Sequence, residues 1–202
     1  IIVSNQAGRS NILSRLEKYG VKIDSKDPNV QKILDEVKDR EFSGYSYDGA
    51  DASFELLANR LLGKLPEYLK VKSYNVSVAK SDTIKTKANV IFLIDGKNIE
   101  CSGEGNGPVN ALDNAIRSNF KKVEKYYNFF SDLKLLDYKV RILNTGTEAT
   151  TRVLIESTDK TGVSWFTVGV SPNIIEASFK ALIDSLDYKL YKEKAPPNLN
   201  EK

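Results

Sequence analysis

The chain has 202 residues, and its 30 Lys and Arg nearly balance its 27 Asp and Glu, so the formal net charge is only +3. That near-balance argues against a nucleic-acid partner, and no apolar run approaches the ~20 residues that a membrane helix needs. The sequence contains no His, the commonest metal ligand and general base, so neither a catalytic residue nor a metal site is expected in it.

The single cysteine, Cys101, cannot form an intrachain disulfide, and its place in a predicted strand favours a buried thiol. We therefore expect a reducing, cytoplasmic location. The chain also has no Met, not even at position 1, which we interpret as a sign that it is a piece of a longer protein.

Residues 1–65 are predicted to form a helical subdomain. Apolar residues recur at spacings of three and four in a first helix over 10–20, in a second that begins at Pro28 and in a third that begins at Asp51. Residues 40–49 contain two glycines among aromatic residues and are expected to form a loop.

Residues 66–195 are predicted to form two successive βββα units, 66–130 and 131–195. The strands are expected over 69–78, 86–94 and 97–103 and again over 133–143, 151–157 and 164–170, and the helices over 108–126 and 173–191. Asp95-Gly96 between two apolar runs is typical of a hairpin turn.

The predicted fold class is therefore α+β, an N-terminal helical subdomain followed by a duplicated βββα domain with pseudo-twofold symmetry. Residues 196–202 are expected to be a disordered tail. Lys189, Lys192 and Lys194, just before that tail, are interpreted as a solvated helix face.

Two separate similarities at one offset indicate the duplication. Gly105-Asn106-Gly107-Pro108 matches Gly169-Val170-Ser171-Pro172, 64 residues later (169 − 105 = 64), and the same offset relates 69–78 to 133–142. Chance similarity between two strand-like and helix-start stretches is the alternative. The glycines in these two turns could adopt positive φ, or they could allow another group to approach the backbone closely.

A helix that starts behind such a turn presents free N–H groups and a partial positive charge, and is therefore a possible anion site. The carboxylate of an amino acid would suit it, with Glu104, Asp137 or a strand carbonyl accepting from the ammonium and the aliphatic residues of the helix starts forming an apolar wall. Core packing is the alternative role for those aliphatic residues. The candidate binding residues are Gly105, Asn106, Gly107, Pro108, Val109, Leu112, Ile116, Asp137, Tyr138, Ser171, Asn173 and Ile174.

The stretch from Gly105 to Asp113 resembles the signature turn of the allosteric domain of the α-isopropylmalate synthase superfamily, a domain built from a duplicated βββα unit. Other stretches resemble the citramalate synthase branch of that superfamily; they are 153–157, 165–171, 173–178 and 181–190. Residues 7–12 and 44–54 are similar to the linker subdomain that lies just before the allosteric domain.

The resemblance implies a regulatory fragment without cofactors of its own, which holds a homodimer together and binds a branched-chain amino acid. Isoleucine would be the effector in a citramalate synthase, and leucine in a 2-isopropylmalate synthase. The parent enzyme would condense acetyl-CoA with pyruvate in a barrel that holds a divalent metal, and that barrel is expected to lie outside this chain. A dimerisation module without a ligand is the remaining alternative.

Overall fold

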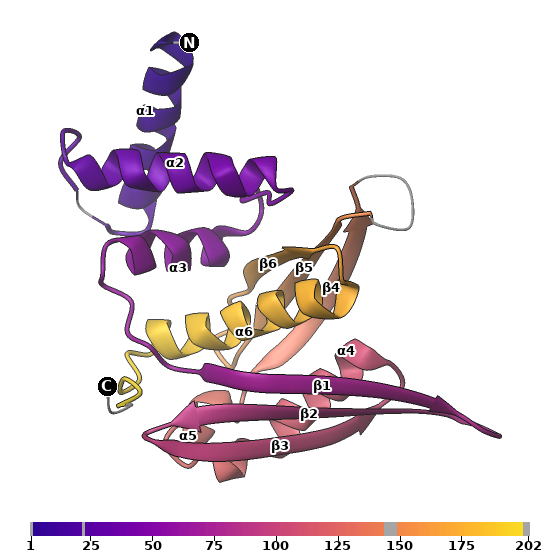
Figure 1. Cartoon of the computed structure of the whole chain (residues 1–202). Coiled ribbons are helices and arrows are strands. Elements are labelled where there is room, and N and C mark those ends of the chain that lie inside the picture. The colour runs from indigo at the N-terminus through magenta and orange to yellow at the C-terminus, as the bar shows by residue number, and fades with distance from the viewer. Residues whose placement is uncertain (1, 22, 144–148, 200–202) are drawn as a thin grey trace.

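A computed structural model of the chain describes residues 2–21, 23–143 and 149–199, and it confirms the α+β class (Figure 1). Three helices are followed by two three-stranded antiparallel sheets, each of which leads into a helix. The elements are α1 (Ile2–Lys18), α2 (Pro28–Phe42), α3 (Asp51–Leu61), β1 (Lys70–Lys80), β2 (Ile84–Ile94), β3 (Lys97–Gly105), α4 (Pro108–Ser118), the 3₁₀ turn η1 (Phe120–Lys122), α5 (Tyr127–Phe130), β4 (Lys134–Ile142), β5 (Thr151–Thr158), β6 (Trp165–Ser171) and α6 (Ile174–Lys192). The boundaries at residues 65, 130 and 195 remain predictions.

The two sheets repeat each other down to an irregularity in their first strands. The β1–β2 pairing shifts register between Val71 and Ser73, and the β4–β5 pairing shifts between Leu135 and Asp137. The two bulges lie 64 residues apart (135 − 71 = 64), so the offset expected from the sequence is correct for the first strand. Asp95 and Gly96 both have positive φ in the hairpin turn between β2 and β3, as predicted.

The offset increases along the unit, which corrects one predicted equivalence. The residues in register across the first sheet are Tyr74, Val90 and Cys101, and those across the second are Tyr138, Ile155 and Thr167. Their separations are 64 (138 − 74), 65 (155 − 90) and 66 (167 − 101). Gly169 therefore corresponds to Gly103 and not to Gly105, and the residue before α4, Gly107, corresponds to Asn173 before α6.

Gly103 and Gly169 allow a strand and a helix to approach closely. A Cβ added at Gly103 would overlap the backbone of Ala115, and one added at Gly169 would overlap the carbonyl of Ala177. Neither glycine has positive φ. Glycine is therefore needed at these positions because the helix approaches the strand closely, and not because the backbone takes an unusual conformation.

α4 ends earlier than the sequence indicates. We predicted one helix from 108 to 126, whereas α4 ends at Ser118 and the chain continues through η1 and α5. Asn119 accounts for the difference, because its buried side chain donates to the carbonyls of Ala115 (2.7 Å) and Ser102 (2.8 Å). An Asn side chain that bonds to the backbone in this way competes with continued helix.

A single hydrophobic core extends through both βββα units. It includes Trp165 and, as expected, the buried Cys101. Tyr74 of β1 and Phe179 of α6 pack with ring centroids 4.1 Å apart, so the first sheet contacts the helix of the second unit. A second core joins the three N-terminal helices to the outer face of the second sheet through Val168 and Val170.

Among the described residues, the core of the three N-terminal helices includes the outer face of the second sheet but not that of the first. The sequences of the two outer faces explain the difference. The equivalents of Val168 and Val170 in the first sheet are Ser102 and Glu104, 66 residues earlier (168 − 102, 170 − 104). These polar side chains leave less apolar surface on the first sheet for a helix to cover. Ser53 of α3 strengthens the contact, because its hydroxyl accepts from the N–H of Val168 (3.0 Å) and donates to Asp184 of α6 (2.8 Å).

The expected disordered tail is wrong for residues 196–199, which pack against the first unit. The Asn198 side chain donates to the Leu93 carbonyl and accepts from the Asp95 N–H, each at 2.8 Å, while its backbone N–H donates to the Glu67 carbonyl at 2.8 Å. These bonds fix the chain end to the β2–β3 turn. The rest of the predicted tail lies outside the described residues.

Candidate functional site

The first strand-to-helix junction leaves the start of α4 uncapped. Gly107, the N-cap residue, has extended backbone and no side chain that could accept from the helix, and Pro108 follows as its first residue. The Asn110 side chain accepts from the N–H of Asn106 (3.1 Å) instead. In the described part of the chain, the N–H groups of Val109 and Asn110 have no protein acceptor. An anionic group could therefore bind at this helix start.

The second junction is closed by its own side chains. Asn173 accepts from the backbone N–H groups of Ile175 (2.8 Å) and Glu176 (3.2 Å). The Ser171 hydroxyl accepts from the N–H of Asn173 (3.0 Å) and donates to the Glu176 carboxylate. That hydrogen bond and an ion pair with Lys180 lower the pKa of Glu176, so a negative charge already stands at this helix start. The start of α6 therefore lacks the free N–H groups expected of an anion site.

Asp137 and Tyr138 lie on opposite faces of the second sheet, because neighbouring residues on a strand alternate. Tyr138 is in register with the buried Ile155, and its hydroxyl lies 2.7 Å from that of Ser178 in α6. Asp137 lies on the other face and pairs with Lys139 at 2.9 Å. The structure thus places Tyr138 beside a helix and separates Asp137 from both helix starts.

The aliphatic candidates divide into core residues and surface residues. Leu112 and Ile116 are fully buried in the core of this single chain, which agrees with the alternative that they serve packing. Ile174 at the start of α6 is about half exposed, with a relative accessibility of 46%. Of these three, only Ile174 is available to a ligand or partner outside the chain.

Ile174 belongs to a set of exposed apolar residues that we call the apolar rim: Val78, Ile84, Val140, Ile142 and Ile174. The four strand residues lie on the helix-facing side of the sheets, because they are in register with residues of that face. Figure 1 shows β1 and β2 running past the start of α4, so the helices leave these strand ends uncovered. Val78 and Ile84 lie at one end of the first sheet, and Val140 and Ile142 lie at the corresponding end of the second. Exposed apolar residues at such strand ends are candidates for an interaction surface.

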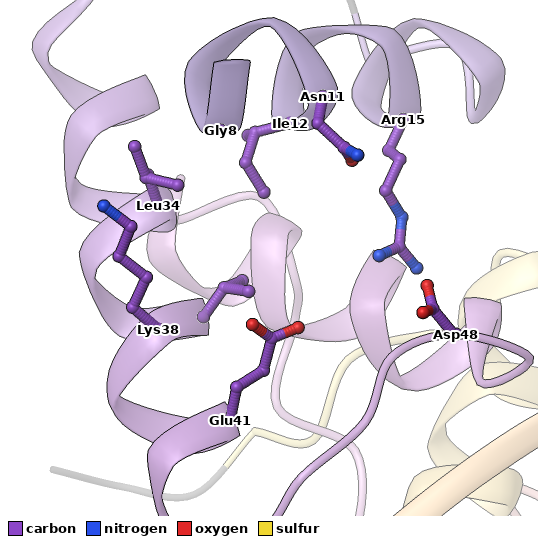
Figure 2. Close-up of a pocket in the computed structure, with 9 residues that line it drawn as sticks. Gly8, Asn11, Ile12, Arg15, Leu34, Lys38, Glu41 and Asp48 are labelled. Atoms are coloured by element: carbon purple, nitrogen blue, oxygen red, sulfur yellow. The ribbon is translucent and has the colours of Figure 1, made fainter. Parts of the chain in front are cut away.

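A cavity of about 390 Å³ lies between α1 and α2 in the helical part of the chain (Figure 2). Arg15, Lys38, Glu41 and Asp48 bring charges of both signs to it, while Ile12 and Leu34 supply apolar surface. None of the twelve predicted binding residues lines this cavity, so it is separate from the two helix starts.

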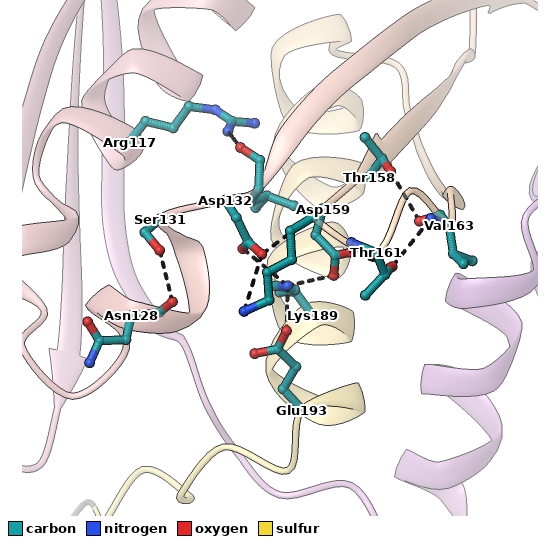
Figure 3. A network of polar contacts seen from close by, with 12 residues as sticks. Arg117, Asn128, Ser131, Asp132, Thr158, Asp159, Thr161, Val163, Lys189 and Glu193 are labelled. Carbon is teal, nitrogen blue, oxygen red and sulfur yellow. Dashed lines mark hydrogen bonds and ion pairs between the residues drawn. The ribbon is translucent and has the colours of Figure 1, made fainter.

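A charged network that the sequence did not predict surrounds Lys189 (Figure 3). The side chain is only 1% exposed, and its ammonium contacts Asp132 (3.2 Å), Asp159 (2.6 Å) and Glu193. These three carboxylates could hold a metal ion by their spacing, but the Lys189 ammonium itself contacts all of them.

The network shifts the pKa of its members and corrects the interpretation of Lys189 as a solvated residue. Burial alone would raise the pKa of Asp159, but hydrogen bonds from Lys189 and Thr161 lower it to about 2. The signal was present in the sequence, because Lys189 follows Leu182 and Leu186 at spacings of four and three and so shares their buried helix face.

The comparisons with known proteins agree with the duplicated architecture. The family described as the LeuA allosteric (dimerisation) domain matches residues 48–190. The chain is 47% identical over 197 residues to the (R)-citramalate synthase of Geobacter sulfurreducens, a match that covers 95% of this chain and 37% of that protein. The (R)-citramalate synthase of Aquifex aeolicus is 45% identical, with 96% and 37% covered.

A 2-isopropylmalate synthase of Aquifex aeolicus is more distant, at 30% identity over 189 residues, with 93% of this chain and 33% of that protein covered. The chain therefore spans about 37% of the length of the citramalate synthases that it matches. No helix in the described part of the chain is both long enough and apolar enough to span a membrane.

Proposed function

This chain belongs to the family of LeuA allosteric (dimerisation) domains, and from that premise we propose that it is the regulatory, dimerising part of a citramalate synthase. The higher identity to two citramalate synthases than to a 2-isopropylmalate synthase supports this branch. In this proposal the parent enzyme condenses acetyl-CoA with pyruvate in a metal-dependent barrel, and this chain senses the end product.

We propose that the effector is a branched-chain amino acid, isoleucine in the first place, and that its carboxylate binds at the start of α4. The observation that carries this assignment is the contrast between the two helix starts. Gly107 leaves the N–H groups of Val109 and Asn110 without an acceptor among the described residues, whereas Asn173 caps α6. A carboxylate at α4 would satisfy donors that the protein leaves open.

The aliphatic side chain of the effector needs an apolar surface, and the apolar rim is the exposed surface of that kind near the helix starts. Val109 is partly exposed beside the open N–H groups, while Leu112 is fully buried. A second copy of the chain that covered the rim would enclose an effector bound at α4. The effector site and the homodimer are therefore parts of one proposal.

Inhibition would follow from linkage between the two binding equilibria. An effector that binds the dimer more tightly in a state that disfavours catalysis inhibits by that difference in affinity. The helical part of the chain is the route by which the change would reach a catalytic domain, because α3 packs on both β6 and α6.

Two measurements on the chain test the proposal. Isothermal titration with isoleucine, leucine and valine should give heat of binding with isoleucine at the highest affinity, and light scattering should give twice the monomer mass. Tighter binding of leucine would favour the 2-isopropylmalate synthase alternative. A dimer that binds none of the three would favour a module without a ligand.

The role of the rim in dimerisation can be tested separately. Ile142→Lys places a charge on the rim and should shift the chain toward monomer. Val163→Lys is the matched control, because Val163 is also exposed and apolar but lies outside the rim. Equal dimer stability in both variants would contradict the rim as the interface.

A further inference from the structure

A basic groove lies on the outer face of the second sheet, away from the open helix start. Its volume is about 540 Å³, within the range of small-molecule sites. It lies between strands β4 and β5 and the loop before α3. Its lining residues are Ser46, Asp48, Lys139, Val140, Arg141, Arg152 and Leu154. Three cations thus face one carboxylate in this groove.

The main feature of the groove is a pair of arginines in direct register. Arg141 on β4 pairs with Arg152 on β5 across the antiparallel ladder. Like charges at directly opposite positions destabilise a sheet. The repulsion also affects the pKa of Arg152, which is lowered by partial burial and then by the charge of Arg141.

Neither arginine has its charge neutralised by a carboxylate within the described ranges, whereas Lys139 beside them pairs with Asp137 at 2.9 Å. Arg152 uses one donor, since its Nε–H donates to the carbonyl of Gly44 at 2.6 Å. That bond anchors the guanidinium to the loop of the helical part. The remaining donors of both side chains have no acceptor among the described residues and could therefore bind a ligand.

We propose that this groove binds a small oxyanion, the phosphate or carboxylate group of a metabolite, bridged by the guanidinium groups of Arg141 and Arg152. Two planar forks can each donate in bidentate fashion to an oxyanion, and the ligand charge would offset the repulsion between them. The site does not depend on the effector proposal, because its two arginines lie on the opposite face of the sheet from the apolar rim and are not among the effector residues. A bound oxyanion would also reinforce the contact between the sheet and the Gly44 loop.

The test compares thermal unfolding of the whole chain in inorganic phosphate and in sodium chloride at equal ionic strength. Phosphate should raise the melting temperature by roughly 3 °C at a concentration tenfold above its Kd, while chloride should not. Malonate at the same ionic strength separates the two ligand classes. A larger shift in phosphate assigns a phosphate ligand, and a larger shift in malonate assigns a dicarboxylate.

Two variants make the test specific. Arg141→Gln should lose the phosphate shift, yet in chloride it should melt no lower than the original chain, because the substitution relieves the repulsion. Lys87→Gln is the control, since Lys87 pairs with Glu104 on the first sheet, and it should retain the shift. Equal shifts in phosphate and chloride, or an undiminished phosphate shift in Arg141→Gln, would overturn the proposal.

Discussion

Gly103 and Gly169 occupy the same position in two copies of one unit, and each lies directly against the backbone of an alanine in the following helix. Gly103 faces Ala115, and Gly169 faces Ala177. This close approach sets the distance between strand and helix in both units. It also positions the start of α4, because β3 leads into that helix through only two residues.

Gly169→Ala should lower the free energy of unfolding by about 1–3 kcal/mol, the usual cost of forcing an extra methyl group into a packed core. Urea unfolding would measure the loss. Gly107→Ser is the matched control, because a Cβ at Gly107 meets no atom within 4 Å. If both variants unfolded at the same urea concentration, close packing at Gly169 would not be required.

Lys189→Met should destabilise the chain by about 3–5 kcal/mol, because it leaves three clustered carboxylates without their buried cation. Chemical unfolding near neutral pH would measure the difference. Lys192→Met, on the exposed side of the same helix, should change stability by less than about 0.5 kcal/mol. Similar losses in both variants would show that Lys189 contributes no more than a surface lysine.

Asp187 makes stability depend on pH, because burial and the carboxylate of Asp184 raise its pKa to about 8, an effect that Arg60 only partly offsets. The folded state therefore holds a proton that the unfolded state has released above its ordinary pKa of 3.8. Stability from this group falls as pH rises from about 4 to 8, by at most about 1.4 kcal/mol per pH unit.

Asp187→Asn removes the titrating group and should flatten this dependence, with a gain in stability that grows toward pH 8. Urea unfolding of both proteins across that range would show it. Parallel pH profiles for the two proteins would mean that Asp187 is ionised in the folded state at neutral pH.

Asn198→Ala should cost about 1–3 kcal/mol, because the substitution leaves the Leu93 carbonyl and the Asp95 N–H without their partner. Hydrogen exchange should report faster opening of the β2–β3 turn. Unchanged exchange at Asp95 would indicate that the terminal segment does not hold the turn in solution.

Local patterns in the sequence predicted the elements well where short-range chemistry decides them. Asp95-Gly96 forms the expected hairpin turn, and the apolar spacing after Pro28 corresponds to α2 with its buried Val30 and Ile33. The similarity of 69–78 to 133–142 correctly located two equivalent strands.

The errors arose where partners distant in sequence decide the structure. The match of Gly105 to Gly169 followed similar letters, but strand register makes Gly103 the equivalent residue. Asn119 ends α4 through a carbonyl on β3 that no local pattern reveals. Lys189 was interpreted from its charge alone, whereas two of its three carboxylate partners, Asp132 and Asp159, come from segments distant in sequence.

From the sequence, the binding site could be located only to the region where the two helices begin. That one start is open and the other capped depends on Gly107 and Asn173 occupying equivalent positions, which needs the correct offset of 66. The separation of Asp137 from both starts depends on the bulge in β4. The placement of the individual side chains in a bound complex stays a prediction.

The most direct test is a titration of isoleucine against the original chain, Gly107→Ser and Gly107→Asp. Both substitutions cap α4, but only Asp adds a negative charge where the effector carboxylate should bind. We expect at least tenfold weaker binding in Gly107→Asp than in Gly107→Ser, with the dimer intact in both. Equal isoleucine affinity in the two variants would contradict the start of α4 as the carboxylate site.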